Sequence, residues 1–245
     1  MAQPPKALVT GASRGLGRAL AQRLLDQGHA VITVARDEGR LADLAAAHPG
    51  RVIALPADLA EPAERDRLAD RIADEHPDLA LVINNAARQE EIDLFADPAA
   101  ATGRMQAELA LNLAAPIVLT TALLPVLARQ PAAHVVNVTS GLAFSPKAAA
   151  PGYSASKAGL KSFTTALRYQ CEAAAPHIRV SEAILPLVDT DMTAGRGRGK
   201  IAPEAAAQAI LDGALAGKST IWVGKARLLP ALLRLSPALV ARLLR

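Results

Sequence analysis

Short apolar runs alternate with longer helical segments along this chain, and this alternation constrains the fold more than any other feature. Seven runs are apolar through their middles, as is typical of strands covered on both faces. They lie at 6–10, 30–35, 51–57, 79–84, 134–140, 178–185 and 220–224. Helical periodicity occupies the intervals at about 15–28, 38–47, 62–76, 99–130, 153–175 and 203–216. The pattern predicts an α/β fold with a doubly wound, mainly parallel seven-stranded sheet that is flanked by helices and joined by right-handed crossovers.

The chain is expected to form one domain. It has 245 residues, of which 51% are hydrophobic, and no linker or low-complexity tract divides it. We predict that residues 1–224 form the domain and that residues 225–245 are a basic amphipathic extension of it. The lone cysteine, Cys171, precludes an internal disulfide and is interpreted as a buried filler. The five histidines are scattered without ligand spacing, so no metal site is expected.

The positive charge of the chain is concentrated at its C-terminal end. Residues 225–245 hold five basic side chains and no acidic one, so the net charge of +4 leaves 4 − 5 = −1 for the remainder. This distribution argues against a nucleic-acid-binding domain. Leucines recur at helical spacing in the extension, and Ser236-Pro237 could start a second helix. The extension is expected to pack on the domain or on another subunit, and weak contact with an anionic membrane surface is the alternative.

An uncharged stretch at 109–128 is long enough to span a membrane. Asn112, Pro116 and Pro125 interrupt it and a strand-like run follows, which favours a helix buried against the sheet on one side and a partner subunit on the other. A homodimer or homotetramer is therefore expected. The N-terminus enters a strand within a few residues, which leaves no room for a signal peptide and favours the cytoplasm.

The first strand ends in a glycine-rich turn, TGASRGLG at 10–17, that opens a helix. Glycines allow a sharp turn and let phosphate oxygens approach main-chain N–H groups, while the helix N-terminus supplies partial positive charge. Within the first β-α-β unit this pattern predicts a dinucleotide-binding site.

The second strand indicates which dinucleotide binds. A ribose-binding acid is usual near its end, but Arg36 stands there, and Arg14 of the glycine turn could converge on the same spot. Two guanidinium groups suit a 2′-phosphate, so NADP(H) is favoured over NAD(H). Asp37 could oppose this preference, or it could cap the following helix. Asp58 follows the third strand, where it could meet the adenine ring.

Tyr153 and Lys157 lie four residues apart in a helical segment, so their side chains share one face. A cation beside a phenol favours the phenolate and lowers the pKa of the phenol, which makes a useful acid or base near neutral pH.

These motifs occur in an order and spacing that resembles the short-chain dehydrogenase/reductase superfamily, a group with a Rossmann-type fold. The resemblance covers residues 6 to about 224. It is carried by the glycine turn, Asp58, NNAA at 84–87, Asn112, Ser140, and Tyr153 with Lys157. The resemblance implies hydride transfer between a nicotinamide and a carbonyl/alcohol pair, without a metal.

The resemblance also implies roles for individual side chains. Tyr153 would exchange a proton with the substrate oxygen, and Lys157 would lower its pKa and hold the nicotinamide ribose. Ser140 would hydrogen-bond the substrate, and Asn112 would hold a water on a proton path. The residues expected to contact the cofactor are Gly11, Ser13, Arg14, Gly15, Leu16, Gly17, Arg36, Asp58, Leu59, Asn85, Ala86, Tyr153, Lys157, Pro186 and Thr190.

Two positions depart from the family pattern. Ala87 stands where the family has glycine, which is tolerable unless the backbone needs a positive φ. Leu187 stands where glycine usually follows Pro186, and it is expected to reshape the pocket near the nicotinamide. Substrate selectivity is expected from loops at the carboxyl ends of the strands. The candidates are Leu142, Ala143, Phe144, Leu187 and Met192, the 193–203 loop with Arg196, Arg198 and Lys200, and Arg88 and Lys147 at the rim.

Two other functions remain open at this point. One is an epimerase or dehydratase that retains its nicotinamide. The other is a non-catalytic protein that senses NADP(H) and docks through its C-terminal extension, although a sensor has no need of an intact Asn-Ser-Tyr-Lys set.

Overall fold

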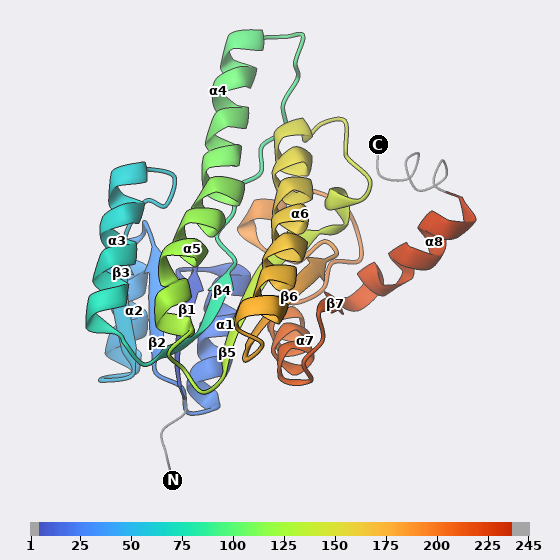
Figure 1. Cartoon of the computed structure of the whole chain (residues 1–245). Coiled ribbons are helices and arrows are strands. Elements are labelled where there is room, and N and C mark those ends of the chain that lie inside the picture. The colour runs from blue at the N-terminus through green and yellow to red at the C-terminus, as the bar shows by residue number, and fades with distance from the viewer. Residues whose placement is uncertain (1–4, 237–245) are drawn as a thin grey trace.

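The computed structural model describes residues 5–236 (Figure 1). Its centre is a seven-stranded sheet in the order β3-β2-β1-β4-β5-β6-β7, and every neighbouring pair is parallel. The strands are β1 (Lys6–Thr10), β2 (Val31–Ala35), β3 (Val52–Pro56), β4 (Leu79–Asn84), β5 (Ala133–Ser140), β6 (Ile178–Leu185) and β7 (Thr220–Trp222). All seven predicted strands are present, and β7 is shorter than the sequence indicated. The predicted doubly wound fold is confirmed.

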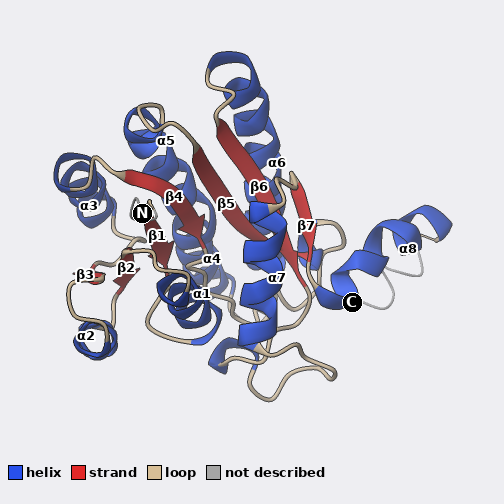
Figure 2. Cartoon of the chain, turned by 90° about the horizontal axis from the view of Figure 1, so that it is seen from below, coloured by secondary structure: helices blue, strands red, loops and turns tan. Residues whose placement is uncertain are grey.

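Helices cover both faces of the sheet, as Figure 2 shows. One layer contains α1 (Gly15–Asp26), α2 (Glu38–Ala47) and α7 (Pro203–Leu215). The other contains α3 (Pro62–Glu75), α5 (Ala115–Leu127) and α6 (Pro151–Ala174). Each layer buries its own apolar cluster against the sheet, with Leu20 and Leu24 in the first and Leu119 and Leu123 in the second. Because helices cover both faces of the sheet and exclude water, the strand sequences are apolar at successive positions.

The long apolar helix of the sequence is two helices joined by a π-helical turn. α4 (Pro98–Leu109) leads into the turn Ala110–Ala114, and α5 follows. Residues 98–127 are long and apolar enough to cross a membrane by length and composition, and they are the one such candidate among the described residues. In the fold, however, Leu119, Leu123 and Leu127 of α5 are fully buried against the sheet. The half of this segment that packs on the sheet therefore has the burial of a core helix.

Cys171 is buried and not in a disulfide, as predicted. No group of side chains that could hold a metal ion occurs in residues 5–236.

The C-terminal extension begins with a 3-10 segment, Gly224–Leu228, which leads into the short helix α8 (Leu229–Leu235). In Figure 1 α8 lies at the side of the sheet formed by β6 and β7. The second helix predicted from Ser236-Pro237 lies outside the described residues.

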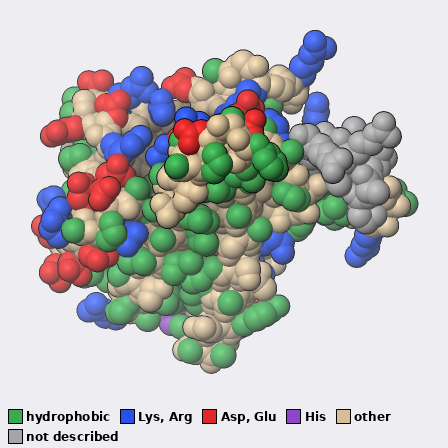
Figure 3. Space-filling view, turned by 90° about the horizontal axis from the view of Figure 1, so that it is seen from above, with side chains coloured by type: hydrophobic (Ala, Val, Ile, Leu, Met, Phe, Trp, Pro, Cys, Tyr) green, Lys and Arg blue, Asp and Glu red, His purple; other side chains and the backbone are tan. Residues whose placement is uncertain are grey.

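Hydrophobic side chains are exposed on the face above the carboxyl ends of the strands. Figure 3 shows them over the middle of this face, while most acidic side chains lie at its left and basic side chains lie at both sides. Phe95 and the adjacent Leu94 are 95% and 45% exposed, and Leu109, at the other end of α4, is 37% exposed. Leu94 and Phe95 precede α4, and Leu109 is the last residue of α4 and the first of the stretch 109–128 that was expected to meet a partner subunit.

Candidate active site

A cleft of about 820 Å³ lies at the carboxyl ends of the strands, where parallel α/β sheets bind ligands. All of the residues predicted to bind the cofactor line it, and Ser140 lines it as well. Asn112 does not reach the surface of the cleft, because it is fully buried behind it. The volume of the cleft is within the usual range for small-molecule and cofactor sites.

The glycine turn packs directly against the segment that follows β4. Gly11 has φ +70°, and a Cβ added to it would lie 2.9 Å from the Cα of Ala86. The Thr10 hydroxyl accepts hydrogen bonds from the backbone N–H groups of Asn85, at 2.9 Å, and Ala86, at 3.0 Å. Arg14 precedes α1 and makes no side-chain cap to it, so no side chain at the cap competes with a ligand for the first N–H groups of α1. The turn is therefore suited to bind a phosphate group.

The charged residues after β2 do not have the arrangement that the sequence suggested. Arg36 lies 3.5 Å from a carboxylate oxygen of Asp58. Arg14 does not converge with Arg36, because its guanidinium pairs with Asp191 at 3.2 Å. Asp37 accepts a hydrogen bond from the N–H of Arg40 at 3.0 Å and so caps α2. Of the two roles considered for Asp37, the helix cap is the one observed.

Tyr153 and Lys157 face the cleft from the first turns of α6. The Lys157 Nζ lies 5.8 Å from the centroid of the Tyr153 ring and donates a 2.8 Å hydrogen bond to the carbonyl of Val138. Lys157 is 2% exposed, and among the described residues it has no carboxylate at ion-pair distance. A buried ammonium ion thus lies one helical turn from a phenol, as the sequence spacing predicted.

Burial dominates the proton affinities of this pair. It raises the pKa of Tyr153 to about 12, although the Ser140 hydroxyl, which hydrogen-bonds the phenol, acts to lower it. Burial also lowers the pKa of Lys157 to about 8. The expectation of a lowered tyrosine pKa is therefore wrong for the protein groups alone, because the cost of burying a phenolate exceeds the attraction of nearby positive charge.

Asn112 braces the segment after β4 against α6. It lies in the π-helical turn, and its side-chain amide accepts from the N–H of Arg88 and donates to the carbonyl of Arg88, both at 2.9 Å. It also donates to the hydroxyl of Ser156 on α6 at 3.2 Å. The contact with Ser156 is buried and the two with Arg88 are partly buried, and together they account for an asparagine inside an apolar helix.

Glu108, one turn before Asn112, forms a second brace that the sequence did not reveal. It is fully buried, and its Oε1 accepts from the N–H of Glu90 at 2.8 Å. Its Oε2 faces the start of α6, where a Cβ added to Gly152 would lie 2.4 Å away. Burial raises the pKa of Glu108, and within residues 5–236 its Oε2 has no hydrogen-bond partner. The start of α6, which carries the tyrosine, is therefore packed against a buried carboxyl group.

Glu108→Gln tests this brace through the pH dependence of stability. Because the pKa of Glu108 is raised above 4.5 in the folded protein, the folded state holds the proton more strongly than the unfolded chain does. The free energy of unfolding of the wild type, relative to the variant, should therefore be greatest in acid and fall as pH rises through the raised pKa. Urea unfolding across this range measures it. Glu172→Gln, at an exposed site on α6, is the control. If the difference in free energy of unfolding between wild type and Glu108→Gln instead rises with pH, hydrogen bonding to the carboxylate outweighs burial.

The substrate end of the cleft matches the sequence prediction in part. Leu142, Leu187, Met192, Lys147 and Arg196 line the cleft as predicted. Ala143, Phe144, Arg88, Arg198 and Lys200 do not line it. A 3-10 turn at Gly141–Ala143 directs Phe144 to Trp222, with ring centroids 5.3 Å apart. Arg88 pairs with Glu90, and Lys200 pairs with Asp189 at 3.3 Å.

Sequence reasoning missed several lining residues, among them Gln89, Leu111, Lys225, Leu229 and Leu232. The last three belong to the C-terminal extension, so this extension contributes to the cleft instead of merely following the domain. Their helical leucine spacing was the available signal, but it does not say which surface α8 covers.

Comparison with known proteins places this site in a family. A family profile described as short chain dehydrogenase matches residues 5–200. The chain is also 38% identical over 228 residues to the uncharacterized oxidoreductase DltE of Bacillus subtilis, over 87% of this chain and 86% of that protein. The chain belongs to the short-chain dehydrogenase/reductase superfamily. It is therefore an oxidoreductase by family, and the resemblance stated from its motifs is confirmed.

Other members of the superfamily share the fold over most of the chain. A short chain dehydrogenase from Burkholderia cenocepacia J2315, crystallised with NADP, is 29% identical with a TM-score of 0.86, over 99% of this chain and 98% of that one. A short-chain dehydrogenase from Sphingobium yanoikuyae in complex with NADPH is 26% identical with a TM-score of 0.82, over 97% and 95%. The putative ketoacyl reductase 2 of the granaticin polyketide synthase of Streptomyces violaceoruber is 33% identical, over 78% and 76%. A nucleotide cofactor is thus a property of its solved relatives.

Proposed function

We propose that the protein is an NADP(H)-dependent dehydrogenase or reductase that acts on a carbonyl/alcohol pair. The observation that carries this proposal is the convergence of Tyr153, Lys157 and Ser140 with the glycine turn in one cleft. The cleft fits a dinucleotide, since the glycine turn has no room for a Cβ at Gly11 and the N-terminal N–H groups of α1 have no side-chain cap. When bound, the nicotinamide supplies or accepts the hydride.

In this proposal the residues of the chain hold the cofactor and move the proton. The N–H groups of the glycine turn bind the diphosphate, and Asp58, Leu59 and Ala86 border the adenosine. Lys157 holds the nicotinamide ribose with its ammonium group. Tyr153 donates the proton to the carbonyl oxygen in reduction, and Ser140 donates a second hydrogen bond to the same oxygen, where negative charge develops. Asn112 and Glu108 keep these groups in place through the backbone.

The pKa values favour reduction. With a pKa raised to about 12, the Tyr153 phenol remains protonated through the neutral range and is ready to act as an acid. Lys157, with a pKa lowered to about 8, keeps most of its charge at neutral pH and can stabilise the phenolate that forms. The alternatives are a cofactor-retaining epimerase or dehydratase and a non-catalytic sensor. Net loss of NADPH absorbance with a carbonyl substrate separates the three, since only a reductase consumes NADPH.

Two further expectations belong to this proposal. The exposed apolar side chains along 94–109 support a homodimer or homotetramer, to be tested by analytical ultracentrifugation. A cytoplasmic location agrees with the use of NADPH as a reductant.

The preference for NADP(H) over NAD(H) depends on Arg36. Its guanidinium is 69% exposed at the nucleotide end of the cleft and is held near Asp58. Arg36→Ala is expected to weaken NADPH binding about tenfold to a hundredfold, which is the worth of one charged hydrogen bond, and to change NADH binding little. Titration of protein fluorescence with each nucleotide measures both affinities. Equal losses for the two nucleotides would contradict a 2′-phosphate contact. Arg67→Ala, at an exposed position of α3 that does not line the cleft, is the control.

A further inference from the structure

Two of the cations that line the cleft form no ion pair within the described part of the chain. Arg196 and Lys225 both line the cleft, and neither lies within 4.0 Å of a carboxylate oxygen in residues 5–236. The neighbouring cations differ, because Lys147 pairs with Glu91 at 3.0 Å and Lys200 with Asp189 at 3.3 Å. Arg196 and Lys225 are therefore available to an anion that enters the cleft.

The loop that carries Arg196 is anchored at its base and lies against the cleft. The N–H of Ile201 donates to the carbonyl of Leu187 at 3.0 Å, and Lys200 donates to the carbonyl of Thr193 at 2.8 Å. A Cβ added to Gly197 would lie 2.4 Å from Leu187, and one added to Gly199 would lie 2.7 Å from the Lys225 Nζ. The loop thus packs on Leu187, beside the expected nicotinamide position, and brings Arg196 to the same side as Lys225.

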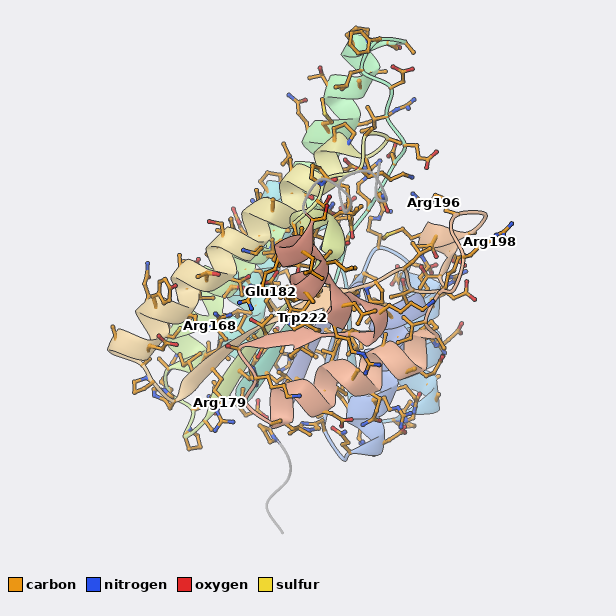
Figure 4. The ribbon with its side chains drawn as sticks, turned by 90° about the vertical axis from the view of Figure 1, so that its right-hand side faces the viewer. Arg168, Arg179, Glu182, Arg196, Arg198 and Trp222 are labelled. Atoms are coloured by element: carbon orange, nitrogen blue, oxygen red, sulfur yellow. The ribbon has the colours of Figure 1, made fainter. Side chains whose placement is uncertain are left out.

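Arg196 and Arg198 belong to the same loop but differ in direction. Figure 4 shows Arg198 extending away from the body of the protein, whereas Arg196 is directed back toward it. Arg196 is half-buried and lines the cleft, and Arg198 is exposed and does not. The positive charge of Arg196 acts to lower the pKa of both Tyr153 and Glu91. Tyr153 lines the cleft, and Glu91 pairs with Lys147, which also lines it. Arg196 therefore acts at this end of the cleft and not at the glycine turn, whose Arg14 is paired with Asp191.

An apolar wall adjoins the two cations. Leu229 and Leu232 project from one side of α8 and Leu142 from the turn after β5, and all three line the cleft. A ligand that is complementary to these two cations and to this apolar wall has one anionic group and a hydrophobic body.

We propose that the substrate is an oxo acid, or the corresponding hydroxy acid, whose carboxylate binds between Arg196 and Lys225 and whose apolar chain packs on α8. This inference rests on the proposed function and names the substrate class of the same site. In reduction, the carbonyl carbon receives a hydride from NADPH and the oxygen receives a proton from Tyr153, which gives the hydroxy acid and NADP⁺. Tyr153 then regains its proton from solvent.

The test compares a medium-chain oxo acid with its methyl ester, which has the same carbonyl and chain but no charge. With the full-length protein and NADPH, kcat/KM is expected to be at least about tenfold higher for the acid. Arg196→Gln should lower kcat/KM for the acid about tenfold to a hundredfold, the worth of one charged hydrogen bond, and leave the ester nearly unchanged. Arg198→Gln is the matched control, since it removes the same charge from the same loop outside the cleft, and it should change neither.

Binding is measured separately from turnover, by calorimetry of the hydroxy acid and its ester with the NADP⁺-loaded protein. Tighter binding of the acid that is lost in Arg196→Gln supports the inference even if no carbonyl compound is turned over, in which case the proposed reaction fails alone. Reduction of acid and ester with equal kcat/KM, unaffected by Arg196→Gln, overturns the inference and leaves the proposed function intact. A higher KM for NADPH in Arg196→Gln, equal with both substrates, also overturns it, because Arg196 would then bind the cofactor phosphates.

Discussion

Replacement of Tyr153 by phenylalanine is expected to lower kcat for carbonyl reduction about a hundredfold to ten-thousandfold, the range that general acid catalysis contributes. The substitution removes one oxygen and keeps the ring, so the packing of the first turn of α6 and the neighbouring Lys157 ammonium remain. NADPH affinity should change little, because the phenol is not the main contact to the nucleotide. Steady-state oxidation of NADPH gives kcat, and fluorescence titration gives the affinity.

The chain provides a matched control for this variant. It has two tyrosines, and the second, Tyr169, is on the same helix but is 64% exposed and away from the cleft. Tyr169→Phe should therefore retain full activity. Turnover that survives Tyr153→Phe, or that falls equally in both variants, would remove the assignment of the proton donor.

The secondary structure was predictable because its signals are local. A parallel strand buried on both faces must be apolar throughout, and a helix that packs on it must have an apolar stripe, so each element is encoded within its own residues. The same holds for the glycine turn, because a positive φ at Gly11 and the close approach to Ala86 leave little choice of residue. Ala87 in place of the family's glycine is accommodated, since no residue other than glycine in 5–236 has a positive φ.

The errors arose where two distant segments decide a side chain's environment. Arg14 was expected beside Arg36, but Asp191, 177 residues further along the chain, attracts it instead. Phe144 was expected in the pocket, but Trp222 of β7 offers an aromatic partner outside it. The Tyr153 pKa was expected to be low because Lys157 is near, yet the depth of burial, which spacing cannot show, has the larger effect. No sequence pattern reports such contacts before the fold is known.

Gly17 is the position where one added methyl group should have the largest effect on the fold and the cofactor site together. It is the third residue of α1, and a Cβ there would lie 2.0 Å from the Gly11 carbonyl oxygen and 2.7 Å from the Asn85 side-chain nitrogen. The first contact is with backbone that cannot move without opening the glycine turn. Gly17→Ala is therefore expected to lower the free energy of unfolding by about 3 kcal/mol, the upper end for overpacking, and to abolish detectable NADPH binding.

Gly103→Ala separates this steric effect from the usual benefit of alanine in a helix. Gly103 lies within α4, and a Cβ added to it would meet nothing within 4 Å. This variant should gain about 0.5–1 kcal/mol in urea unfolding, because alanine loses less backbone entropy on folding, and should bind NADPH normally. The same gain would act in Gly17→Ala, so a net loss there measures the clash minus this benefit. If Gly17→Ala instead folded and bound NADPH as tightly as Gly103→Ala, the turn between β1 and α1 would have room for a Cβ at this position. The claim that the backbone of this turn approaches the phosphate closely, on which the nucleotide site depends, would then be wrong.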